Sequence, residues 1–98
     1  GLMYMKQSFV YILTNRHRSV FYIGVTANLQ KRMQYHRLGI GSKFCQRYNV
    51  STLIYYEVFL DISDAIQRET VLKRWKRDWK IALIEKRNPG LKDLLAKG

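Results

Sequence analysis

Two short runs near the start of the chain combine β-branched and aromatic residues. They span residues 8–13 and 20–25, and the residues between them are mostly polar. Runs of this composition are typical of β-strands, and a short polar link between two of them is typical of an antiparallel hairpin. The pattern therefore predicts a hairpin over residues 8–25.

Alternation along the hairpin assigns its side chains to two faces. A symmetric pairing sets Leu13 opposite Val20 and, in the same register, Tyr11 opposite Tyr22. Both phenols then share a face with Gly24, where the missing side chain lets another group approach closely. The other face is apolar throughout and is predicted to lie in the core; it carries Val10, Ile12, Phe21, Ile23 and Val25.

A helix is predicted to follow the hairpin and to run to about residue 38. Thr26 or Asn28 suits its N-terminal cap, and Gly39 suits its end. Leu29 and Met33 are four positions apart and are predicted to face inward.

Residues 39–60 predict a turn, a short helix and a third strand. Ser42 is expected to cap a helix that runs through Tyr48, with Phe44, Cys45 and Tyr48 partly buried. Residues 51–60 alternate as a strand does. One face of this strand is expected to carry Leu53, Tyr55, Glu57 and Phe59, and the other Ile54, Tyr56, Val58 and Leu60.

Ser63 is predicted to cap a long helix with one apolar stripe. Glu69 lies on that stripe, four residues after Ala65 and three before Leu72, and so breaks its apolar pattern. The remaining members of the stripe are Ile62, Ile66 and Trp75.

The C-terminal segment predicts a further helix and a final short one. Helical spacing resumes over residues 78–87 with Trp79, Ala82 and Leu83 facing inward, and Pro89 ends it. Leu91, Leu94 and Leu95 indicate the last short helix. Together the elements predict one α/β domain over residues 1–98, a small three-stranded antiparallel sheet flanked by helices, with residues 1–7 as a flexible or tag-derived lead-in.

Composition and charge narrow the function. Hydrophobic residues make up 47% of the chain, enough for one core, while 18 Lys and Arg against 7 Asp and Glu give a net charge of +11. This balance favours a polyanionic partner, and nucleic acid is the first candidate. No apolar run approaches the ~20 residues that span a bilayer. Cys45 is the single cysteine, which excludes an internal disulfide framework or thiolate cluster and favours the cytoplasm.

Several segments, in order, resemble the GIY-YIG nuclease domain. Residues 9–11 (Phe-Val-Tyr) occupy the place of the first signature triplet, and residues 22–24 (Tyr-Ile-Gly) match the second. The resemblance continues through Thr26, residues 28–32 and His36, and then through residues 65–69 and 72–75. It is greatest to small stand-alone proteins similar to the nuclease domain of the excinuclease C subunit, which also carry an Asn-Pro near the end, here Asn88-Pro89.

The resemblance implies hydrolysis of a DNA phosphodiester bond with one divalent ion, Mg²⁺ or Mn²⁺. Glu69 is implied as the metal ligand, since a hard cation that keeps several waters needs few protein oxygens. Arg32 is implied to hold the scissile phosphate, and Tyr11 and Tyr22 to border the attacking water. His36 is implied to hydrogen-bond to the phosphate or to Tyr11. Substrate-binding roles fall to Lys31, Lys43, Lys73 and Asn88.

Two departures from the family pattern bear on activity. Phe9 replaces a glycine at a position expected to pack, and Val25 stands where some relatives have a lysine. The chain therefore lacks one cation that would lower the pKa of a phenol or contact phosphate, which leaves that task to Lys31 or Lys43.

Other readings of the same residues stay open. Glu69 could pair with Lys73, Arg32 could be a solvated helix-face residue, and the two tyrosines could simply pack across the hairpin. At the level of function, the alternatives are a non-catalytic nucleic-acid-binding module that keeps the fold, and a small ribosome-associated protein. Branched and damaged DNA are candidate substrates, and choice of the target site would fall to a partner protein.

Overall fold

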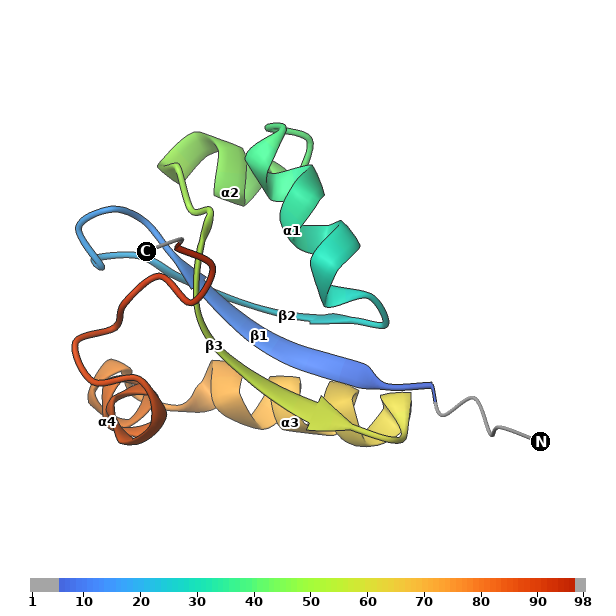
Figure 1. Ribbon diagram of the computed structural model, residues 1–98. Coiled ribbons are helices and arrows are strands. Elements are labelled where there is room, and N and C mark those ends of the chain that lie inside the picture. The colour runs from blue at the N-terminus through green and yellow to red at the C-terminus, as the bar shows by residue number, and fades with distance from the viewer. Residues whose placement is uncertain (1–5, 97–98) are drawn as a thin grey trace.

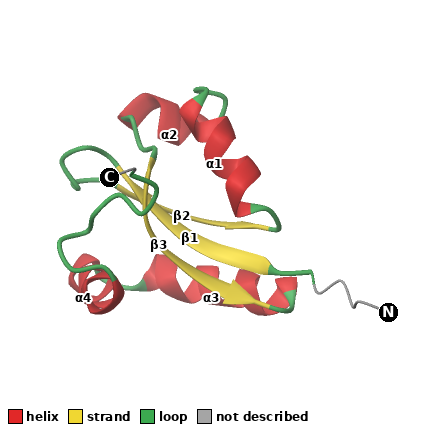
Figure 2. Cartoon of the chain, viewed as in Figure 1, coloured by secondary structure: helices red, strands yellow, loops and turns green. Residues whose placement is uncertain are grey.

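The computed structural model describes residues 6–96 and contains a three-stranded antiparallel sheet (Figures 1 and 2). Its strands are β1 (Ser8–Thr14), β2 (Phe21–Thr26) and β3 (Thr52–Phe59), in the spatial order β2-β1-β3. The predicted strands and their antiparallel arrangement are confirmed. Most of the predicted lead-in over residues 1–7 lies outside the described residues.

Helices cover both faces of the sheet and make a three-layered domain. Figure 1 shows α1 (Leu29–Arg37) and α2 (Lys43–Tyr48) on one face, and α3 (Ile62–Arg74) and α4 (Arg77–Arg87) on the other. The predicted fold class, a small sheet flanked by helices, is therefore confirmed. Within residues 6–96, no helix combines the length and the apolar character needed to cross a bilayer.

The sheet separates two hydrophobic clusters, and β1 contributes to both because its successive side chains point to opposite faces. On the α3 side, Val10 and Ile12 pack with Ile23 of β2 and with Ala65 and Leu72 of α3. This confirms that the apolar face of the hairpin lies in the core. On the α1 side, the cluster consists of Tyr11, Leu13, Met33, Cys45, Val50 and Leu53.

The predicted hairpin register is wrong by two residues. Leu13 pairs with Tyr22 instead of Val20, and Tyr11 pairs with Gly24 instead of Tyr22. The loop explains the shift, because the Asn15 side chain accepts hydrogen bonds from the backbone N–H groups of Ser19 and Val20 and keeps both residues out of the ladder. A shift of two preserves the faces, so both tyrosines still lie on the face predicted for them.

The predicted alternation of β3 fails at one point. Leu13 pairs with Leu53 while Ile12 pairs with Tyr55, so Ile54 is an extra residue in the ladder, a β-bulge. Ile54 and Tyr55 consequently both face α3, while Leu53 faces α1. The prediction that Leu53 and Tyr55 share a face is therefore wrong.

The helix caps follow the sequence at two of three predicted places. Asn28 caps α1 by accepting from the N–H of Lys31, and Ser42 caps α2 by accepting from that of Cys45. For α3, however, the cap is Asp61, whose carboxylate accepts from the N–H and the hydroxyl of Ser63. A carboxylate at this position also interacts favourably with the helix dipole, which explains why Asp61 takes the place predicted for Ser63.

Several residues predicted to be inward are exposed. In α3 the buried stripe is Ala65 and Leu72, because the helix rests on the sheet along that line, and Ile62 and Ile66 remain exposed. In α2 only Cys45 is buried. In α4 the inward residue is Ile84, with Leu83 half-buried. Besides Ile62 and Ile66, the residues wrongly placed inside are Phe44, Tyr48, Trp79 and Ala82.

The predicted final helix does not form. After Asn88 ends α4, Leu91 adopts a positive φ of 50° and is buried, and the N–H of Leu94 donates to the carbonyl of Leu53. Leu94 and Leu95 therefore lie in a turn that is joined to β3 by one backbone hydrogen bond, and of the last leucines only Leu91 is buried.

Glu57 forms an ion pair beneath the sheet with Arg68 of α3. The guanidinium donates two hydrogen bonds of 2.9 and 3.0 Å to the carboxylate, and the Tyr55 hydroxyl donates a third. Burial alone would raise the pKa of Glu57, but the hydrogen bonds from Arg68 and Tyr55 hold the pKa of its carboxyl below the usual value. The pair therefore joins β3 to α3 most strongly when Glu57 is ionised.

Replacing Glu57 by glutamine is expected to lower the free energy of unfolding at pH 7 by about 1–2 kcal/mol, since Arg68 loses its charged partner. Because folding lowers the pKa of Glu57, its contribution is complete above the unfolded-state pKa and disappears as the pH falls through the folded-state value. Urea unfolding at pH 7 and at pH 3 measures this. Wild type and Glu57→Gln should converge in acid, and a gap of constant size would contradict the prediction.

Candidate active site

Three aromatic side chains from three elements meet on the α1 face of the sheet. The ring centroids of Tyr11 and Tyr22 are 6.3 Å apart, and the His36 ring lies 6.5 Å from Tyr11 and 6.2 Å from Tyr22. Tyr11 is 1% exposed and belongs to the hydrophobic cluster, whereas Tyr22 at the edge strand is half-buried. Two strands and α1 thus bring together three residues that the sequence singles out.

Two glycines make room for this cluster. A Cβ on Gly24 would lie 2.5 Å from the Tyr11 hydroxyl oxygen and 2.6 Å from the adjacent ring carbon. A Cβ on Gly41 would likewise collide with Nδ1 of His36. The group that approaches Gly24 is therefore the Tyr11 ring itself. The sequence did not predict the contact between Gly41 and His36, because nothing in the turn around Gly41 indicates which side chain packs against it.

Within the cluster, the pKa values of the Tyr11 phenol and the His36 imidazole shift in opposite directions. Burial raises the pKa of Tyr11 far above the usual phenol value; the Tyr22 phenol adds to this rise, and the Arg32 guanidinium opposes it without offsetting it. Burial, assisted by Arg32, lowers the pKa of His36. Nε2 of His36 is buried and has no hydrogen-bond partner. At neutral pH the site therefore contains a protonated phenol beside a neutral imidazole with an unpartnered nitrogen.

Arg32 and Glu69 lie close enough for their charges to act on the cluster. Arg32 is exposed on α1, and its charge acts on both Tyr11 and His36. Glu69, on α3 across the sheet, is near enough to raise the pKa of Tyr11 further, although burial is the largest cause. The Glu69 side chain is 22% exposed and lies 3.6 Å from Nζ of Lys73. The acid is thus open to water, and the alternative ion pair is present.

The four predicted substrate-binding residues divide into two groups. Lys31, Lys43 and Lys73 are exposed, and Nζ of Lys31 lies 5.8 Å from the centre of the Tyr35 ring. Asn88 is buried, and its amide donates to the carbonyls of Ile54 and Lys92. These bonds attach the C-terminal segment to β3, so Asn88 has a structural function and is not brought to the tyrosines.

The departures from the family pattern have simple structural settings. Phe9 packs edge-on against Tyr56, with ring centroids 6.2 Å apart. Val25 packs against the cluster on the α3 side. Neither side chain lies in the tyrosine cluster, and since both are uncharged, neither position supplies a cation.

The donor set fits a hard divalent ion only as a single-carboxylate site. Within residues 6–96, no three His, Cys, Asp or Glu side chains gather as a metal-binding group. Glu69 is nevertheless half-buried, faces water and carries two oxygens of the kind that Mg²⁺ and Mn²⁺ prefer. It could hold an ion that keeps most of its waters.

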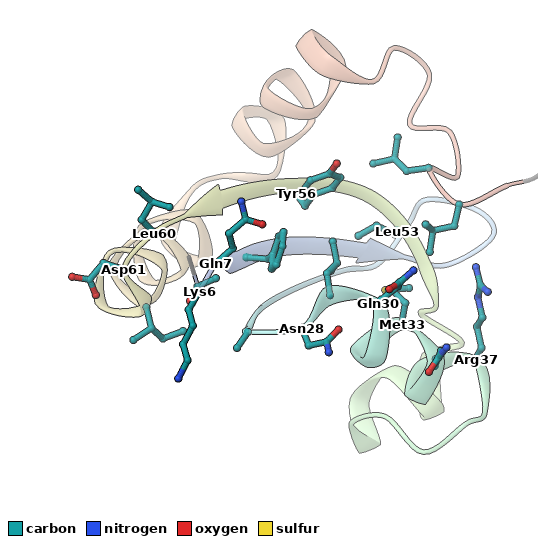
Figure 3. Close-up of a pocket in the computed structure, with 18 residues that line it drawn as sticks. Lys6, Gln7, Asn28, Gln30, Met33, Arg37, Leu53, Tyr56, Leu60 and Asp61 are labelled. Atoms are coloured by element: carbon teal, nitrogen blue, oxygen red, sulfur yellow. The ribbon is translucent and has the colours of Figure 1, made fainter. Parts of the chain in front are cut away.

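A groove lies elsewhere on the same face of the sheet as the tyrosine cluster. It has a volume of about 1470 Å³ and runs between α1 and the outer strand β3, with Met33, Leu53 and Tyr56 among its lining residues (Figure 3). None of the candidate site residues lines it. The tyrosine cluster, in which only Tyr22 of the edge strand β2 is partly exposed, is therefore separate from this groove.

Comparisons with known proteins identify the family of the chain. The family model described as the GIY-YIG catalytic domain matches residues 7–82. A UPF0213 protein of Staphylococcus haemolyticus is 34% identical over 85% of this chain and all of its own, and one of Oceanobacillus iheyensis is 38% identical over 82% and 92%. The solution structure of a UPF0213 protein from Bacillus halodurans, 24% identical, covers 91% of this chain and 94% of its own with a TM-score of 0.56, which shows the shared fold.

Proposed function

The chain belongs to the GIY-YIG nuclease superfamily, and on this premise we propose that it is a metal-dependent endonuclease that hydrolyses phosphodiester bonds of DNA. The observation that carries the proposal is the convergence of Tyr11, Tyr22 and His36 within range of the charges of Arg32 and Glu69. The proposed setting is the cytoplasm, and branched or damaged DNA is the proposed substrate class.

Arg32 would bind the scissile phosphate. Its side chain is exposed on α1, its charge acts on Tyr11 and His36, and a guanidinium has the geometry to donate two hydrogen bonds to a phosphate. Since β2 is an edge strand, the phosphate could enter at its open edge, between α1 and α3. A cation in this place stabilises negative charge as it builds on the phosphate oxygens.

His36 is the better proton acceptor of the cluster. The raised pKa of Tyr11 keeps its phenol protonated at neutral pH, so Tyr11 can donate a hydrogen bond but cannot act as a free base. The lowered pKa of His36 keeps its imidazole neutral, and Nε2 is unpartnered. Tyr22, half-buried between the imidazole and the surface, would position the attacking water and pass its proton toward His36.

Glu69 would hold the divalent ion. When bound, such an ion would supply Lewis acidity toward a phosphate oxygen and lower the pKa of a water. Binding of an ion would weaken the 3.6 Å contact of this carboxylate with Lys73, a partly exposed ion pair of a kind that contributes little to stability. Lys73 would then be free to contact the DNA backbone.

A nicking assay tests the proposal. Supercoiled plasmid and branched DNA are incubated with the protein and Mg²⁺ or Mn²⁺, and we expect nicked and linear products that EDTA abolishes. Arg32→Ala should slow cleavage by about a hundredfold or more, since it removes a charge from the transferring phosphate. Arg37→Ala, an exposed arginine on the same helix, is the matched control and should cut nearly as wild type does. Cleavage by Arg32→Ala at the wild-type rate would exclude this site.

The second candidate function is a non-catalytic DNA-binding module. The Glu69–Lys73 contact and the lack of a cation at Val25 favour it. Binding of the same DNA without cleavage under every metal condition would support this function over the nuclease.

A further inference from the structure

The short helix α2 presents two aromatic side chains to solvent. Phe44 and Tyr48 are 43% and 42% exposed, and being four residues apart they share one face of the helix. Their ring centroids are 4.9 Å apart. Cys45 supplies the buried contact of α2, so the fold of the helix does not require aromatic residues at the two exposed positions.

This aromatic surface is continuous with the candidate active site. The Phe44 ring lies 6.1 Å from the Tyr22 ring, at a tilt of 30°, and Tyr22 in turn contacts His36. A row of rings thus leads from the buried phenol of Tyr11 to the surface of α2. We call Phe44, Tyr48 and Arg47 the α2 platform.

The surroundings of the platform are cationic. The Arg47 guanidinium lies 5.5 Å from the centre of the Tyr48 ring, and Lys43 is exposed on the same helix. All seven acidic residues of the chain lie at position 57 or later, so neither α1 nor α2 contains one. The layer made by these two helices (Figure 1) is therefore complementary in charge to a phosphate backbone.

A second pair of aromatic side chains, Trp75 and Trp79, lies on the side of the sheet opposite α1 and α2, away from the tyrosine cluster. Trp75 and Trp79 pack edge to face at 6.0 Å, and they belong to the α3–α4 side of the sheet. Trp75 is half-buried against the core, which leaves only Trp79 largely exposed. Trp79 therefore serves as a matched control for an exposed aromatic ring in a basic helix.

We propose that the α2 platform stacks unpaired bases of DNA beside the active site, so that the preferred substrate is DNA with unpaired nucleotides. Aromatic rings bind bases through their faces, and a nearby guanidinium adds cation–π and phosphate contacts. A paired duplex keeps its bases stacked inside the double helix, so it exposes no base face to the aromatic rings of the platform. The proposal rests on the proposed nuclease function, because it names the substrate class of that site.

The test compares two fluorescent DNA probes, a perfect duplex and the same duplex with a bulge of three unpaired nucleotides. Affinity is measured by anisotropy in EDTA, where no cleavage occurs. Wild type should bind the bulged probe more tightly. Phe44→Ala and Tyr48→Ala should each weaken binding to that probe by about tenfold and leave the duplex affinity unchanged. Tyr48→Phe, which keeps the ring, and Trp79→Ala should both behave as wild type.

A second readout reports stacking directly. A 2-aminopurine placed in the bulge is fluorescent when unstacked, and wild type should quench it while Phe44→Ala should not. The proposal is overturned if wild type shows no preference for the bulge, or if the alanine variants lose affinity for both probes equally or for neither. Melting temperatures identify any variant that fails to fold, and if one of the two alanine variants does not fold, the other still tests the proposal.

The design separates this proposal from the nuclease function. Binding in EDTA does not depend on turnover, so a protein that never cuts DNA can still show the platform. Conversely, if wild type nicks DNA in the presence of metal and Phe44→Ala binds the bulged probe as tightly as wild type does, the platform proposal is wrong and the nuclease proposal stands.

Discussion

Replacing Glu69 by glutamine should abolish DNA cleavage and leave DNA binding intact. The amide keeps the size of the side chain but loses the charge that would hold a divalent ion, and loss of that ion should slow cleavage by about a thousandfold or more. Affinity for DNA should stay the same or rise slightly, because one negative charge is removed from the binding surface. Nicking of supercoiled plasmid and anisotropy titrations at several salt concentrations measure the two effects.

Two variants separate the metal-binding role of Glu69 from its contact with Lys73. If the carboxylate served only the ion pair, Lys73→Met would cause the same loss of cleavage as Glu69→Gln, whereas we expect it to weaken DNA binding only several-fold. Asp64→Asn changes a second carboxylate of α3, which is exposed, and should leave cleavage intact. A parallel collapse of DNA affinity in Glu69→Gln would show that the residue is structural.

Gly24→Ala should disrupt the site through a single added methyl group. The new Cβ would collide with the hydroxyl and the ring of Tyr11, which is 1% exposed on the central strand and has no room to move away. We expect the free energy of unfolding to fall by about 1–3 kcal/mol, the usual effect of overpacking, and cleavage to be lost even at temperatures where the variant stays folded. Urea unfolding followed by circular dichroism gives the first quantity, and the nicking assay the second.

A double-mutant cycle with Tyr11→Phe assigns the Gly24 effect to its cause. Removal of the hydroxyl takes away the atom nearest to the new methyl group, so Gly24→Ala should cost less stability in the Tyr11→Phe background. Equal costs in both backgrounds would mean that the alanine acts through the β2 backbone and not through the Tyr11 ring.

The sequence predicted the layers of the fold better than the details of strand pairing. The period of two placed Tyr11 and Tyr22 on one face and Ile12 and Ile23 on the other, and this survived a register error, because a shift of two residues leaves every side chain on its face. The side-chain hydrogen bonds of Asn15 that set the register, and the bulge at Ile54, have no signature in hydrophobic periodicity.

Burial was predicted least well where a helix meets the sheet along a narrow line. Ile66 has a strongly apolar side chain and yet is exposed, whereas Ala65 is fully buried, because a small residue lets α3 approach the sheet closely. Composition alone cannot distinguish these neighbours. The candidate site was identified through the two triplets and Glu69, while the contact of Gly41 with His36 and the aromatic face of α2 became visible only in three dimensions.

The confinement of every acidic residue to the second part of the chain has a consequence before any contact with DNA is made. The molecule has an electric dipole whose positive end is the α1–α2 layer, in addition to its net charge. In the electric field of DNA, a protein with such a dipole rotates as it diffuses until its positive end points toward the DNA. Encounters are therefore oriented instead of random. At low ionic strength the protein would already meet DNA with the face that carries Arg32 and the tyrosine cluster turned toward it. Added salt would screen this attraction and lower the association rate.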